Sequence, residues 1–158
     1  MAMPQWIIPT VSIVAACIVS LANFLVQRWR YRIDRLSVAA DHICTEINLA
    51  ADLSTEYWLI DRSDPEVVKT SLRLEPQIIG RQTRIQAVFL ALVRLDSKFI
   101  FDKAENRLAE LFDAMTGDTF QVSGSPPNPE RAMKVQAVAA RLNGLFRESV
   151  ATRSKRIF

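Results

Sequence analysis

The fold is decided by residues 6–32, which read WIIPTVSIVAACIVSLANFLVQRWRYR. Residues 6–26 are mostly apolar, and Cys17 is the only ionisable side chain among them. A helix of this length spans roughly 31 Å, which matches a bilayer core of about 30 Å. The basic and aromatic residues that follow are typical of a membrane–water interface, and flanking Arg favours the cytoplasmic side. We therefore expect a single-pass membrane protein with its N-terminus outside and its C-terminal domain in the cytoplasm.

Two kinds of processing would change the fate of this segment. A cleaved signal peptide needs a positively charged start, and residues 1–5 carry no charged side chain. Val14-Ala15-Ala16-Cys17 is similar to a bacterial lipobox, which keeps lipidation of Cys17 open, although the residues after Cys17 stay mostly apolar. We predict an uncleaved transmembrane anchor over residues 1–27, a basic–aromatic juxtamembrane segment over 28–36 and a cytoplasmic helical bundle over 37–158.

Small and polar side chains of the span are separated by three or four residues, so they share one helical face. This polar face consists of Ser12, Ala16, Ser20, Asn23 and Gln27. A small-xxx-small pattern lets two helices approach closely, and an unpaired amide in hydrocarbon is costly. Asn23 should therefore face protein or water. The face predicts a homo-oligomer and, beyond that, a pore that it lines; the alternative is a monomeric anchor that tolerates these residues.

The juxtamembrane segment combines Arg28, Trp29, Arg30, Tyr31 and Arg32. We interpret it as an anchor at the membrane interface that attracts anionic lipid headgroups. Stacking on nucleic acid is the alternative use of such a mixture. It is disfavoured because a hydrophobic span lies directly beside it.

A heptad pattern of apolar residues continues beyond the basic segment. Its members are Ile33, Leu36, Ala40, Ile43, Ile47, Ala50 and Tyr57, with Ser54 in the remaining position. Such a seam is typical of helices that pack against other helices. Because no Gly or Pro occurs in residues 10–64, the span and the first cytoplasmic helix are expected either to form one continuous rod or to be joined by a short kink.

The remaining pattern is also helical, so we predict an all-α fold with four main helices in an antiparallel bundle. Ser63-Asp64-Pro65-Glu66 and Asn128-Pro129-Glu130 combine a capping residue with Pro at the first helical position. Pro76 is expected to separate a short helix over 65–74 from a longer, centrally buried one over 76–95. Further helices are expected over 99–116, ended by a left-handed Gly117, and over 129–152.

The charge distribution argues against a broad nucleic-acid-binding surface. The net charge of +3 hides two basic patches, residues 28–35 with four Arg and one Asp, and residues 153–156 with three cations. The rest of the chain holds 13 Lys and Arg against 16 Asp and Glu, which leaves it at −3. Membrane lipids, a second copy of the chain and a cytoplasmic protein are therefore the expected partners.

Enzymatic motifs are scarce. The chain has no P-loop, no Gly-rich dinucleotide turn and no Cys pair at metal spacing, so we predict no cofactor, no metal and no enzyme. Arg35 and His42 have an Arg-x6-His spacing that resembles the signature of the all-helical HEPN ribonucleases. The resemblance implies His42 as general acid/base and Arg35 as charge stabiliser. That motif usually lies late in its domain, so a solvated His42 is favoured.

The mixed charges of residues 102–113 are interpreted as a solvated helix face without a role. The layout of one N-terminal span and a small helical domain resembles small bacterial membrane effectors of phage defence. Examples are abortive-infection proteins and the membrane-anchored accessory pore protein of RNA-targeting (type VI) CRISPR systems. The resemblance implies a homo-oligomer that permeabilises the inner membrane when triggered. It carries no motif, and a scaffold module that binds a cytoplasmic partner is the alternative.

Overall fold

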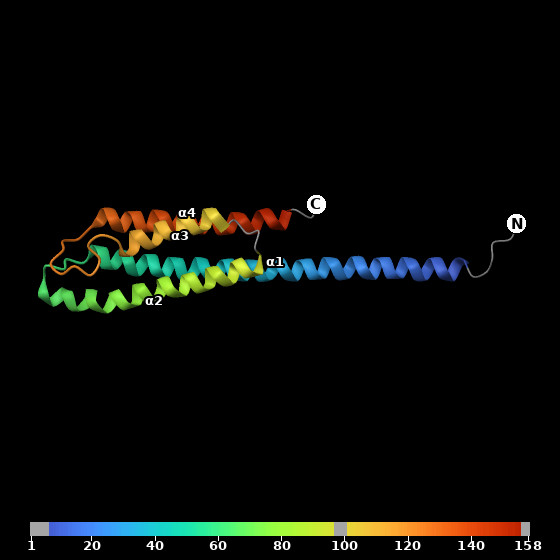
Figure 1. The fold of residues 1–158 in the computed structure, drawn as a ribbon, viewed down its shortest axis with the longest axis horizontal. Coiled ribbons are helices and arrows are strands. Elements are labelled where there is room, and N and C mark those ends of the chain that lie inside the picture. Colours follow the sequence, from blue (N-terminus) through green and yellow to red (C-terminus); the bar gives the residue numbers. More distant parts are fainter. Residues whose placement is uncertain (1–6, 97–100, 156–158) are drawn as a thin grey trace. The chain divides into compact units, whose positions relative to one another are not determined.

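The computed structural model describes residues 7–96 and 101–155, and the side chains of residues 12–96 and 103–155. These residues form four helices, α1 (Ile7–Leu59), α2 (Pro65–Leu95), α3 (Phe101–Thr116) and α4 (Pro129–Ser154), and no strand (Figure 1). The predicted all-α fold is confirmed. The chain divides into two compact units, Met1–Arg35 and Leu36–Phe158.

The described part of the first unit is the start of α1, which holds the apolar run and the basic segment after it. Helix α1 is continuous, so the prediction that the span and the first bundle helix form one helix is confirmed. Pro9 lies in its first turn, where the missing N–H would have no intrahelical partner anyway. The most apolar part of α1 has a mean hydropathy of 1.4 and is wholly exposed. By length and composition, α1 is a candidate membrane-spanning helix.

The second unit is a bundle whose core includes the heptad seam of α1. The seam side chains from Leu36 to Tyr57 are at most 3 % exposed. Polar contacts join α1 to its neighbours: Arg81 of α2 donates to Glu46 at 2.6 Å, and Asn143 of α4 donates to Asn48 at 2.7 Å. The part of the seam from Leu36 to Tyr57 is therefore covered by helices of the same chain.

Helix α2 differs from its prediction at Pro76. The Asp64 side chain accepts a hydrogen bond from the Glu66 N–H at 3.0 Å and caps the helix as expected. The helix then continues through Pro76, so the predicted break there is wrong. An internal Pro costs about 3 kcal/mol. Burial of Leu74 and Ile78 on either side, worth about 1.5–3 kcal/mol each, offsets that cost.

The second half of α2 is not the central helix of the bundle. Phe89 and Leu92 are buried, but Leu90 is 47 % exposed and Ala87 and Ala91 are also exposed. The sequence predicts a centrally buried helix over 76–95, and these exposed side chains contradict that prediction. The buried side chains of this half of α2, Ile85, Phe89 and Leu92, belong to one core cluster with side chains of α1, α3 and α4.

Two buried arginines organise the turn between α3 and α4. The guanidinium groups of Arg62 and Arg131 lie 5.3 Å and 4.8 Å from the centre of the Trp58 ring. Trp58 is 1 % exposed and donates its indole N–H to the Met115 carbonyl at 3.1 Å. Cations over an indole face are attracted to it. This cluster ties the end of α1 to the 117–128 loop.

The left-handed conformation predicted for Gly117 occurs at Asp118, with φ of 50°, and the prediction is wrong by one residue. Gly117 is required for another reason. A Cβ added there would meet the Arg131 side chain and the Asp113 carbonyl, the latter at 2.7 Å. The glycine therefore makes room for the buried Arg131 where α3 ends.

Candidate functional site

The polar face of the span lies on the first turns of α1 that the structure describes. On an α-helix its five residues fall within an arc of about 80°. All five side chains are exposed, and those of Asn23 and Gln27 form no hydrogen bond within the described part of the chain. The amides of Asn23 and Gln27 can therefore hydrogen-bond to groups outside the described residues.

The juxtamembrane residues continue the same helix. Trp29 is partly buried, whereas its basic neighbours and Tyr31 are exposed. The guanidinium of Arg35 lies 5.6 Å from the centre of the Tyr31 ring one helical turn earlier. An exposed mixture of Arg and aromatic side chains fits the interfacial anchor that the sequence predicts.

His42 engages a different set of charges from Arg35. Its Nε2 lies 3.9 Å from the Glu46 carboxylate, which is 8 % exposed and also pairs with Arg81 at 2.6 Å and Arg84 at 3.6 Å. Burial alone would raise the Glu46 pKa, but the Arg81 hydrogen bond and the surrounding cations lower it overall. His42 thus borders an ion-pair cluster that joins α1 and α2. The guanidinium of Arg35, in the first unit, lies over the Tyr31 ring.

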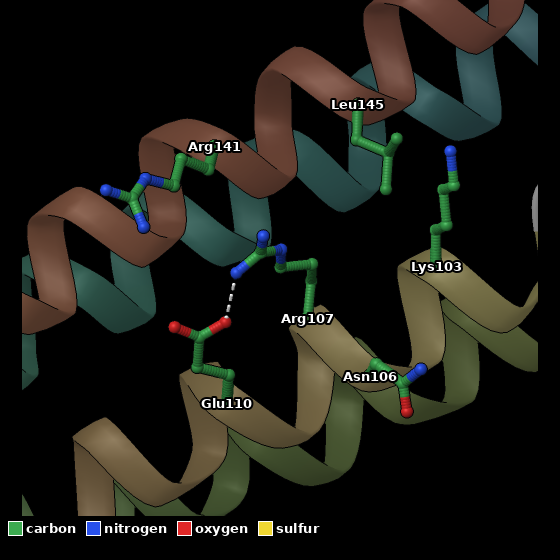
Figure 2. A pocket seen from close by; sticks show the side chains of 6 residues that line it. All are labelled: Lys103, Asn106, Arg107, Glu110, Arg141 and Leu145. Atoms are coloured by element: carbon green, nitrogen blue, oxygen red, sulfur yellow. Dashed lines mark hydrogen bonds and ion pairs between the residues drawn. The ribbon is translucent and has the colours of Figure 1, made fainter.

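A groove of about 530 Å³ lies between α3 and α4. Six residues line it, Lys103, Asn106, Arg107 and Glu110 of α3 and Arg141 and Leu145 of α4 (Figure 2). In Figure 2, Lys103 and Arg107 project from α3 toward α4, and Leu145 projects from α4 toward α3. We call this feature the α3–α4 groove.

The α3–α4 groove is unevenly charged. Arg107 pairs with Glu110 at 2.5 Å, and further along the same two helices Lys134 pairs with Asp113 at 3.3 Å. Within the described part of the chain, Lys103 and Arg141 have no ion pair. The described lining residues therefore comprise three cations and one carboxylate, a net charge of +2.

Comparison of the chain with protein-family models, with curated proteins and with solved structures found no match.

Sequence reasoning missed the groove because its cations come from two distant segments. Lys103 and Arg107 had been placed on a solvated face, and Arg141 had not been singled out. An i, i+4 pair of cations on one amphipathic helix is an ordinary surface pattern. Only the pairing of α3 with α4 adds Arg141 and Leu145 to it.

Proposed function

We propose that this protein is a single-pass membrane protein that self-associates through the polar face of its span and perturbs the membrane as a pore-like effector. The observation that carries the proposal is the pair of amides, Asn23 and Gln27, exposed on an apolar helix without a partner in the described residues. In hydrocarbon, such amides are stabilised by hydrogen bonds to a second helix or to water in a channel.

The proposed topology places the N-terminus outside and the bundle in the cytoplasm. Its support is the basic segment at residues 28–32, which follows the apolar run directly. The bundle buries its own seam, so we assign the contacts between copies to the span. Close approach of the helices is allowed by Ser12, Ala16 and Ser20, whose short side chains keep the backbone accessible.

The test is the double variant Ser20→Leu with Asn23→Leu. Each Leu adds bulk at the polar face, and the second also removes the amide, so the oligomer should dissociate. The light-scattering mass of the protein in detergent should fall to that of a monomer, and depolarisation of cells that express it should disappear. Interhelical hydrogen bonds in membranes contribute roughly 0.6–2 kcal/mol each, which shifts association severalfold per contact.

The matched control is Val14→Leu with Ile18→Leu. These two residues lie on the opposite side of the helix, about 160° or more from the centre of the polar face. The control should keep both the oligomeric mass and the depolarisation. If the polar-face variant retains both readouts, or if the control loses them equally, the effector proposal is wrong.

The resemblance in layout suggests antiviral defence as the setting. We propose that expression lowers phage plating on a bacterial host and that the polar-face variant restores plating. Equal plating with and without the protein would remove this setting while leaving self-association to be judged by mass.

A second candidate function is a membrane-tethered binding module. The α3–α4 groove favours it, because its described lining has a net positive charge. A monomeric mass for the wild-type chain together with ligand binding by the bundle would favour this function over the pore.

A further inference from the structure

We propose that the α3–α4 groove binds a phosphate ester, carried either by a nucleotide-sized soluble molecule or by a phospholipid headgroup. The site belongs to the bundle alone and does not depend on whether the span associates. Its failure would therefore leave the proposed pore function untouched.

The charge of the groove matches a phosphate ester. Among the described side chains that line the groove, Lys103, Arg107 and Arg141 accompany a single carboxylate, that of Glu110, so the lining has a net charge of +2. A phosphate monoester carries roughly 1.5–2 negative charges at neutral pH, whereas a carboxylate carries one. The planar fork of Arg also matches phosphate oxygens and donates two parallel hydrogen bonds to them.

The size and lining of the groove favour a small ligand over a polymer. Small-molecule sites usually enclose about 300–1,000 Å³, and the groove holds about 530 Å³. Leu145 supplies an apolar wall for the non-phosphate part of the ligand, and the Asn106 amide can both donate and accept a hydrogen bond. An extended nucleic acid would need a longer basic stripe, and outside its two terminal patches the chain is net negative.

Glu110 regulates the proposed site. Its carboxylate holds the Arg107 guanidinium at 2.5 Å, so an incoming phosphate has to compete with it. Removal of that carboxylate should free Arg107 and strengthen binding. Removal of a cation from the groove should therefore weaken ligand binding, and removal of its carboxylate should strengthen it. Side chains with a merely structural role would not change the affinity in opposite directions.

The experiment is calorimetric titration of the full chain in a non-ionic detergent. Three probes are used: adenosine monophosphate, adenosine diphosphate and the soluble lipid dihexanoyl-phosphatidic acid, each of which ends in a phosphate with two ionisable oxygens. At least one should bind with a dissociation constant below about 1 mM and should weaken as salt is raised. Binding of the soluble phosphates identifies a free ligand, and binding of the lipid alone identifies a headgroup.

Two matched pairs of variants assign the binding to the groove. Arg141→Gln should weaken it at least about tenfold, whereas Arg73→Gln, which removes an exposed Arg from α2, should leave it unchanged. Glu110→Gln should strengthen it roughly two- to fivefold, whereas Glu105→Gln, on a different side of α3, should not.

The circular dichroism spectrum of each variant should match that of the wild type, because all four side chains are at the surface. The proposal is overturned if no probe binds, or if Arg73→Gln weakens binding as much as Arg141→Gln does.

Discussion

Replacement of Arg62 by Ala should destabilise the bundle more than replacement of any charged residue within the 117–128 loop. Arg62 is 3 % exposed, and within the described residues it has no carboxylate partner. Its Nη1 donates to the Tyr57 hydroxyl at 2.6 Å and to the carbonyls of Thr119 and Val122 at 3.0 and 3.4 Å. The side chain therefore joins the end of α1 to the loop that precedes α4.

The magnitude follows from these contacts. The two shorter hydrogen bonds from a charged donor contribute about 1.5 kcal/mol each, and the stacking on Tyr57 and Trp58 contributes about 0.5 kcal/mol each. Removal of a buried guanidinium also relieves its desolvation cost, which offsets part of that sum. We expect a net loss of about 3 kcal/mol, equivalent to a fall in melting temperature of roughly 6–12 °C.

The assay is thermal unfolding of the full chain in detergent, followed by circular dichroism. Arg62→Lys keeps the charge but not the planar fork, so its melting temperature should lie between those of the wild type and Arg62→Ala. Arg73→Ala removes an exposed Arg and should change stability by less than about 0.5 kcal/mol. A melting temperature for Arg62→Ala within about 2 °C of that of Arg73→Ala would refute the account.

Three further predictions concern stability and reactivity. Gly80→Ala should stabilise α2 by about 0.5–1 kcal/mol, because an added Cβ meets nothing within 4 Å. Gly117→Ala should instead destabilise the bundle, because its Cβ would displace the Arg131 side chain. Chemical denaturation measures both changes in stability, and changes of the same sign would contradict the prediction. The pKa of Glu46 is lowered from its ordinary value of 4.5, so the stability that its ion pairs supply is complete above that pH and is lost as the pH falls through the lowered pKa. Glu46→Gln should therefore flatten the dependence of the unfolding free energy on pH between pH 5 and about pH 3. An unchanged dependence of the unfolding free energy on pH would count against this prediction. Burial raises the pKa of the Cys44 thiol above 9.0, which makes the thiol unreactive at neutral pH. In a Cys17→Ala variant, an aromatic disulfide reagent should therefore label Cys44 only after the protein is unfolded. Rapid labelling of the native protein would contradict the burial of Cys44.

The predictions that succeeded rested on local signals. Asp64 caps α2 and Asn128 caps α4, as their position before a Pro indicates, because a cap needs only the next three residues. The apolar helix near the N-terminus was also readable, because its length and composition are local properties of the sequence.

The predictions that failed required knowledge of what packs against a residue. Pro76 was expected to break a helix, yet the buried Leu74 and Ile78 carry the helix through it. Gly117 was expected to adopt a left-handed conformation, yet its importance lies in the space that it leaves for Arg131. Both outcomes depend on side chains of other helices that pack at the position, and the neighbouring residues in the sequence do not reveal them.

The sequence by itself determined that the chain is helical, that α1 contains an apolar segment long enough to cross a membrane, and that a heptad seam follows it. Only the tertiary structure decided that this seam is buried by α2, α3 and α4 of the same chain. It also decided that Arg141 joins Lys103 and Arg107 in one groove. The physical reason is that periodicity defines which face of a helix is apolar, whereas the partner of that face depends on contacts between segments far apart in the chain.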